Sequence, residues 1–382
     1  FSAFLLERDT PGLGFGAEEK KMGIKGSSTR QVILEDARVP RENLLGELRR
    51  GHVIAFQTLN LGRLKLAAGA VGGAKGMLRL ASSYAQAREQ FGQPIAAFGL
   101  IQEKIGRMAA ETYALESAVY RLTGDLDARL RGLETQAEQL AAIDEYVVEY
   151  SLGSEILGDA IDETLQIHGG NGFSAEYPIE LAYRNSRINR IFEGTNEINR
   201  LLTTGQLLKR AMKGKLNLLQ AAQSAMTGEP LNALELNDRD APAALEDAYL
   251  ALENLKRATL LVAGTGATAY LQDLEREQEV MARAADMVAL AYLAESALLR
   301  AERLGGGSEG RAAGAAAERL ARLYTFAALD GARAFGAEAL RRIPGGRAAL
   351  PKLHAYLEHD LDLIGLRREA AADAYDRGGY PL

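Results

Sequence analysis

The stretch HVIAFQTLNLGRLKLAAGAVGGAKGMLRLASSYAQ, residues 52–86, decides the fold expected for this chain. Its apolar and small residues recur at helical spacing throughout, so it predicts one long helix. Besides Gly62, four glycines lie close together within it, and glycine lowers helix propensity unless a neighbouring helix packs closely against it. We therefore expect close helix packing at Gly69, Gly72, Gly73 and Gly76.

Further helical patterns follow this stretch at short intervals. Long ones cover about 98–130 and 134–168, and shorter ones cover 178–186 and 194–213. The breaks between them are short and contain glycine or proline, as at Phe91-Gly92-Gln93-Pro94 and Gly169-Gly170-Asn171-Gly172. Long helices with short connections favour an antiparallel four-helix bundle.

The rest of the chain divides by composition into three further parts. Residues 1–50 are rich in strand and turn signals, and 51–214 hold the bundle. Residues 215–243 are polar and turn-rich, which indicates a linker, and 244–382 are again helical. The predicted fold is mostly α: the end of a small β-domain, a helical bundle and an additional C-terminal helical domain. Because the chain opens on strand-like residues, we expect a further N-terminal portion before Phe1.

Composition narrows the classes of function. The 382 residues are 47% hydrophobic and 25% charged, as in soluble globular proteins, and the net charge of −6 argues against nucleic-acid binding. The absence of cysteine excludes disulfides and thiol catalysis. His354, Glu358 and His359 cluster at helical spacing, which favours a solvated helix face over a metal site. No signal peptide or membrane-spanning apolar run is visible.

The segment RIFEGTNEINR, residues 190–200, carries the main chemical candidate, Glu193. Beside the apolar Ile191 and Phe192 its carboxylate would be partly desolvated, which suits a general base. Thr195 and Asn196 are helix-capping residues, with Glu197 at the place of a capping-box partner. From these residues alone, an ordinary acidic helix cap is favoured over a base.

A second segment imitates a nucleotide-binding motif. The run Thr259–Ala263 followed by Gly264, Gly266 and Ala269 has the spacing G-x-G-x-x-A. A charged helical sequence follows it, however, where the dinucleotide fold needs a second strand ending in an acid. We interpret these glycines as close helix contacts.

Several motifs together resemble the acyl-CoA dehydrogenase family over the first 210 or so residues. They are EKKMGIKGS (19–27), VPRENLLG (39–46), LGR (61–63), REQFGQPI (88–95), QIHGGNG (166–172) and the Glu193 segment. Within the family the chain is most similar to the very-long-chain branch, which also has a helical C-terminal extension.

The resemblance changes the interpretation of Glu193. It implies FAD-dependent oxidation of a long-chain acyl-CoA to the trans-2-enoyl-CoA in fatty-acid β-oxidation, with Glu193 removing the α-proton. In some branches the base lies at the position of Gly62, which has no side chain here. Gly194 keeps the backbone open beside the base, and Arg63 matches a supporting arginine. The family usually has an aspartate where this chain has Asn185, which removes one charge near the loop.

The resemblance also implies a cofactor site shared between subunits and a set of partners. The FAD contacts would be Arg88, Gln90, Phe91, Gln166, Gly169, Gly170, Thr195 and Glu197. Electrons would pass to an electron-transferring flavoprotein from a homodimer. The place of action would be the bacterial cytoplasm, or the mitochondrion in a eukaryote, and the linker is not basic enough to support peripheral membrane contact. The alternatives are a non-catalytic assembly member of the family and an acyl-CoA oxidase.

Overall fold

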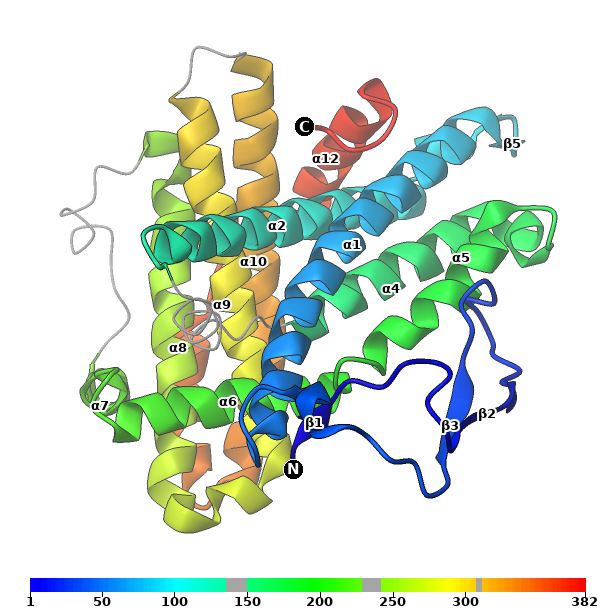
Figure 1. Cartoon of the computed structure of the whole chain (residues 1–382). Helices are drawn as coiled ribbons and strands as arrows, with labels where there is room; N and C mark the ends of the chain where they lie inside the picture. The colour runs from blue at the N-terminus through cyan, green and yellow to red at the C-terminus, as the bar shows by residue number, and fades with distance from the viewer. Residues whose placement is uncertain (135–149, 229–241, 307–310) are drawn as a thin grey trace.

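A computed structural model describes residues 1–134, 150–228, 242–306 and 311–382. Long helices make up most of this structure, and the strands form only small two-stranded sheets (Figure 1). This confirms the predicted mostly helical fold. Within the described part of the chain, no helix is both long enough and apolar enough to cross a membrane.

The first 50 residues contain two antiparallel strand pairs. β1 (Ala3–Phe4) pairs with β4 (Leu44–Leu45), and β2 (Leu13–Glu18) pairs with β3 (Arg30–Leu34). Every residue of β3 is exposed, so this pair encloses no core of its own. A third pair, β5 (Glu89–Gln90) with β6 (Gln93–Pro94), forms a hairpin at the far end of the first helix.

The bundle helices agree closely with the sequence pattern. They are α1 (Gly51–Ala87), α2 (Gly99–Leu130), α4 (Tyr150–His168), α5 (Pro178–Ser186) and α6 (Asn196–Met212). The start expected for the third helix, near residue 134, adjoins 135–149, which lie outside the described residues.

The glycines of α1 have different surroundings. A Cβ built on Gly73 would lie 2.7 Å from Cδ1 of Leu157 on α4, so the expected close packing is confirmed there. A Cβ on Gly69, Gly72 or Gly76 would meet no atom of the described structure within 4 Å. The prediction of close packing is therefore wrong for these three within the described residues, because no neighbouring atom comes close to them.

The second half of the chain is also helical. Its helices are α7 (Leu218–Thr227), α8 (Glu246–Tyr270), α9 (Gln278–Gly305), α10 (Arg311–Arg342), α11 (Leu350–Tyr356) and α12 (Leu363–Asp376). The predicted linker 215–243 contains the helix α7. This part of the prediction is corrected, because α7 packs on α8 through contacts such as Ala222 against Gly264. Residues 229–241 of that prediction lie outside the described part.

The two halves share one hydrophobic core. Buried residues of α1 and α2 join those of α8, α9, α10 and α12 in a single cluster. Figure 1 shows α2 crossing the upright helices α8, α9 and α10. Gly264 and Gly266 lie within α8 at contacts with other helices, which confirms their interpretation as packing glycines rather than a nucleotide loop.

The backbones of α2 and α12 approach each other closely where the two helices cross. A Cβ on Gly106 would lie 2.0 Å from the backbone oxygen of Arg367, which cannot move without α12 moving too. Gly124, on the same helix, is exposed and has open space around it.

We predict that Gly106→Ala destabilises the protein by about 3 kcal/mol, because the extra methyl group forces two backbones apart. Gly124→Ala is the matched control, and we expect it to stabilise by up to about 1 kcal/mol through helix propensity. Denaturant unfolding of the two variants checks both values. Equal effects from the two substitutions would contradict the close contact.

Candidate active site at the Glu193 loop

Glu193 lies on a tight loop between the short 3-10 helix η4 (Arg187–Arg190) and α6. Both Glu193 (φ +60°) and Gly194 (φ +86°) have left-handed backbone conformations, which are uncommon for a glutamate. Strained backbone of this kind concentrates at functional sites. The Glu193 side chain is half-buried, although its neighbour Ile191 is 49% exposed, so the expected apolar flank is open on that side.

The Glu193 carboxylate lies directly over Gly62 of α1. A Cβ built on Gly62 would be 3.1 Å from Oε2 and 3.3 Å from Oε1 of Glu193. These distances are shorter than ordinary van der Waals contact, so glycine at position 62 leaves the space that the carboxylate occupies. Within the described residues, the carboxylate takes part in no hydrogen bond or ion pair, so its lone pairs are free to accept a proton.

Arg63 binds the backbone of the Glu193 loop and forms no ion pair with the Glu193 carboxylate within the described residues. Its Nε donates to the Glu193 carbonyl oxygen at 2.9 Å, and its Nη1 donates to Oδ1 of Asn60 at 2.9 Å. Arg63 is only 6% exposed, and burial lowers the pKa of its guanidinium while the negative charge of Glu193 opposes that shift. Arg63 therefore contacts the Glu193 segment directly, through the hydrogen bond to its carbonyl group.

The other side of the loop is held by α6. Nδ2 of Asn199 donates to the Gly194 carbonyl at 3.0 Å, and the Thr195 hydroxyl caps the helix by accepting from the Ile198 N–H at 3.4 Å. Thr195 is therefore confirmed as the N-cap. The capping-box assignment of Glu197 is wrong, because it is the second residue of α6 rather than the third. Its carboxylate accepts instead from its own N–H and the Thr195 hydroxyl, which lower its pKa.

An ion-pair network that the sequence analysis did not assign fixes the start of α6. Arg200 forms a two-pronged pair with Glu155 of α4, at 2.9 and 2.7 Å, and also pairs with Asp286 of α9 at 2.5 Å. Asn196 Nδ2 donates to the same Glu155 at 2.9 Å. Asn196 and Arg200 stand in the quoted Glu193 segment, but no local signal connects them to acids 41 and 86 residues away.

The remaining predicted cofactor residues form a second group at the other end of α1. Tyr84 brings this group together, because its ring stacks on His168 at 4.0 Å between centroids and its hydroxyl accepts from Asn171 Nδ2 at 2.9 Å. The contact brings the end of α4 and its following turn beside the β5–β6 hairpin. The members of this group are all exposed: Arg88, Gln90, Phe91, Gln166, Gly169 and Gly170.

This second group has features that suit a bound anion with an aromatic part. Arg88 has no ion-pair partner within the described residues, and Phe91 is 93% exposed. A Cβ on Gly169 or Gly170 would meet nothing within 4 Å, so backbone there is open to a close approach. Arg88 directly follows α1 and is 26 residues beyond Gly62, which corresponds to about 39 Å along the helix. The structure therefore does not bring the two groups together within one chain.

The loop of residues 21–26 packs on α5. The backbone N–H of Ile24 donates to Oδ1 of Asn185 at 2.7 Å, and Arg184 Nη1 donates to the Met22 carbonyl at 3.0 Å. A Cβ on Gly23 would lie 2.5 Å from the Arg184 oxygen, so only glycine fits. The neutral Asn185 thus contacts this loop by a hydrogen bond to its backbone.

The predicted histidine cluster has a different arrangement from that expected. α11 ends at Tyr356, so His359 lies beyond the helix, with a side chain only 10% exposed and 3.4 Å from Asp330. The solvated helix face expected for this segment is therefore wrong for His359, because the chain turns inward after Tyr356. Within the described residues, no three His, Asp or Glu side chains are grouped as metal ligands.

Comparison with known proteins identifies the family. Sequence models described as the acyl-CoA dehydrogenase C-terminal domain match residues 49–208 and, for a second such model, residues 254–353. The chain belongs to the acyl-CoA dehydrogenase family.

Individual relatives agree with this assignment. A probable acyl-CoA dehydrogenase of Bacillus subtilis is 49% identical over 312 residues, which cover 79% of this chain and 52% of the relative. The mitochondrial very long-chain specific acyl-CoA dehydrogenase of Bos taurus is 42% identical over 205 residues, or 54% of this chain and 30% of that protein.

The same relationship is seen in three dimensions. The crystal structure of a Bacillus anthracis acyl-CoA dehydrogenase complexed with FAD has a TM-score of 0.91 and 43% identity, covering all of this chain and 66% of that one. The chain spans about half the length of the Bacillus subtilis relative.

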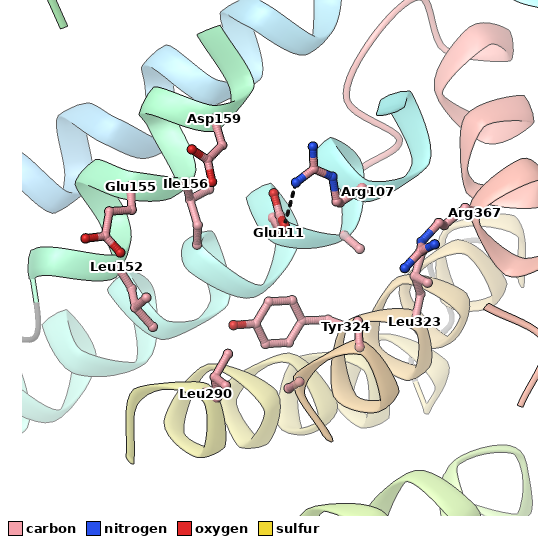
Figure 2. A pocket seen from close by; sticks show the side chains of 13 residues that line it. Arg107, Glu111, Leu152, Glu155, Ile156, Asp159, Leu290, Leu323, Tyr324 and Arg367 are labelled. Atoms are coloured by element: carbon pink, nitrogen blue, oxygen red, sulfur yellow. Dashed lines mark ion pairs between the residues drawn. The ribbon is translucent and has the colours of Figure 1, made fainter. Parts of the chain in front are cut away.

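A cavity lies between the two helical halves, and Glu155, the partner of Arg200, lines one side of it. It has a volume of about 190 Å³ and is lined by α2, α4, α9, α10 and α12 (Figure 2). Glu111 points into it, with Arg107 as its nearest cation at 4.0 Å, and Asp159 and Tyr324 lie on opposite sides of it. Burial raises the pKa of Glu111 to about 7, because neither Arg107 nor Arg367 is close enough to offset the loss of water.

We predict that Glu111→Gln stabilises the protein at pH 8 and has little effect at pH 4. An acid whose pKa is raised by folding stabilises the folded state fully below its unfolded value of 4.5, and this contribution is lost as the pH rises towards 7. The gain at pH 8 should be about 3 kcal/mol. Denaturant unfolding at both pH values checks it, and a gain that does not depend on pH would contradict the raised pKa.

Proposed function

We propose that the protein containing this chain is an FAD-dependent acyl-CoA dehydrogenase that oxidises long-chain acyl-CoA to trans-2-enoyl-CoA, with Glu193 as the base. The observation that carries the proposal is the free carboxylate of Glu193 in the space above Gly62. In some branches of the family the base lies at the position of Gly62. Here glycine has no side chain to act as a base, and it leaves room for the Glu193 carboxylate.

The residues of the loop divide the reaction between them. The Glu193 carboxylate would remove the α-proton of the acyl group. FAD, when bound, would supply the acceptor for the β-hydride. The Glu193 N–H donates no hydrogen bond within the described structure, so it is available to the thioester oxygen as charge develops there. Arg63 and Asn199 donate to the carbonyl groups of Glu193 and Gly194. These hydrogen bonds fix the loop backbone and so orient both the N–H and the carboxylate of Glu193.

The separation of the two groups of residues supports a cofactor site built from two copies of the chain. One copy would provide the Glu193 loop, and the Arg88 group of a second copy would bind the pyrophosphate and adenosine end. The unpaired guanidinium of Arg88 and the open backbone at Gly169 and Gly170 suit a phosphate group. This arrangement supports a homodimer as the working unit.

The choice of substrate and electron acceptor rests on the relatives. The similarity to the very long-chain specific enzyme of Bos taurus supports long acyl chains. We propose an electron-transferring flavoprotein as acceptor. Turnover with oxygen in its place would identify an oxidase, and a flavin that acyl-CoA does not bleach would identify an assembly member of the family.

We predict that Glu193→Gln in the full-length protein retains FAD and loses palmitoyl-CoA dehydrogenation by about 10³-fold, because the amide cannot accept the proton. Glu176→Gln, an exposed acid before α5, is the matched control and should keep wild-type turnover. Anaerobic bleaching of the flavin by palmitoyl-CoA measures the effect. Near-normal bleaching in Glu193→Gln would refute the assignment of the base.

We predict that Arg88→Ala lowers the flavin content of the purified full-length protein, because the pyrophosphate loses a cationic partner. Arg79→Ala, an exposed arginine two turns earlier on α1, is the control. The ratio of flavin to protein absorbance measures retention. If Arg88→Ala binds FAD as tightly as the control, the proposed role of the second group is wrong.

A further inference from the structure

The start of α6 is tied to α4 by side chains that lie only a few residues after the base. Asn196 is three residues from Glu193, and its amide bridges Glu155 at 2.9 Å and Ser154 at 3.1 Å. Arg200 lies one turn later and binds both oxygens of the same Glu155. Because Asn196 is 3% exposed, this end of the loop cannot shift without breaking buried hydrogen bonds.

One carboxylate of the C-terminal half completes this arrangement. Asp286 of α9 is 1% exposed and receives a hydrogen bond from Nε of Arg200 at 2.5 Å, on the side of the guanidinium that Glu155 does not cover. Its other oxygen faces Arg283 at 3.3 Å, which in turn pairs with Glu338 of α10 at 2.8 Å. Asp286 thus links the base-bearing segment to helices of the other half.

The charges in this network depend on one another. The Arg200 side chain is 14% exposed, so its guanidinium needs buried counter-charges. Burial raises the pKa of Asp286, and the hydrogen bonds from Arg200 oppose that shift. For Arg200, the pairs with Glu155 and Asp286 outweigh burial and raise the pKa. Removal of the Asp286 charge therefore weakens the hold on Arg200 and, through Arg200, on Glu155, whereas Glu338 contacts neither of these residues.

We propose that Asp286 is a positioning residue for the Glu193 base: acting through Arg200 and Glu155, it fixes the start of α6 and with it the loop that holds the carboxylate over Gly62. This inference rests on the proposed function. It gives the C-terminal helical half an indirect part in the active site, because Asp286 reaches the loop only through Arg200.

The test is Asp286→Asn in the full-length FAD-loaded protein, with Glu338→Gln as the control. Asparagine keeps the shape and removes the charge, whereas Glu338→Gln breaks an outer pair of the same network that does not touch Arg200. We expect kcat for palmitoyl-CoA to fall about 10- to 100-fold in Asp286→Asn with KM unchanged, because the base is misplaced while the substrate still binds. The control should keep wild-type kcat.

Amide hydrogen exchange provides a readout that does not depend on turnover. Peptides covering residues 191–200 should exchange faster in Asp286→Asn than in the wild type or the control. If Asp286→Asn does not fold, Arg200→Lys replaces it, because lysine keeps the charge but cannot bind both oxygens of Glu155 and Asp286 together.

Two results separate the possible failures. Lower thermal stability with unchanged kcat and unchanged exchange in 191–200 would overturn the inference, since Asp286 would then act only on the fold. Faster exchange in 191–200 in a protein whose wild type oxidises no acyl-CoA would support the anchoring of the loop and refute the proposed function.

Discussion

The close approach of the Glu193 carboxylate to Gly62 is the constraint on which the rest of the site depends. A Cβ at position 62 would lie only 3.1 Å from a carboxylate oxygen of Glu193. The position of the carboxylate therefore depends on how the loop packs against α1. α1 is also long enough to separate the two groups of residues. Gly62 lies near its start, and the exposed Arg88 group lies at its end. The loop is then fixed by hydrogen bonds to its carbonyl groups, which leave the carboxylate free.

The arrangement of the helices explains how a strained loop can be stable. A left-handed backbone conformation such as that of Glu193 is stable only where several surrounding contacts hold it. Here Arg63 holds it from α1, Asn199 from α6, and the pairs of Arg200 hold α6 itself on α4 and α9. The two helical halves share one core, so the loop is supported by the whole of the described bundle.

The sequence was informative where the signal was local or periodic. Helical periodicity predicted α1, α2 and α5 to within one residue or so, because burial of one face imposes that spacing. It was less informative for contacts between distant segments. Nothing in the pattern shows that Gly73 meets α4 while Gly69 is open, or that α7 packs within a polar, turn-rich stretch.

The candidate site shows the same division. Glu193 alone was better explained as a helix cap, and the role of base that we propose for it came only from the set of family motifs. The Arg200–Asp286 pair was not predicted, because its partners are 86 residues apart and each stands in an ordinary amphipathic pattern. Glu197 was misassigned by one position, since the sequence does not show whether Thr195 or Gly194 precedes the first helical residue.

The most direct test of the account is Gly62→Ala in the full-length protein. The added methyl group would displace the end of a flexible side chain rather than backbone, so folding and flavin content should be preserved. We expect the rate of flavin bleaching by palmitoyl-CoA to fall about 10-fold or more, because the Glu193 carboxylate must move away from its position. An unchanged bleaching rate in a folded, FAD-loaded Gly62→Ala variant would contradict the claim that the space above Gly62 holds the base.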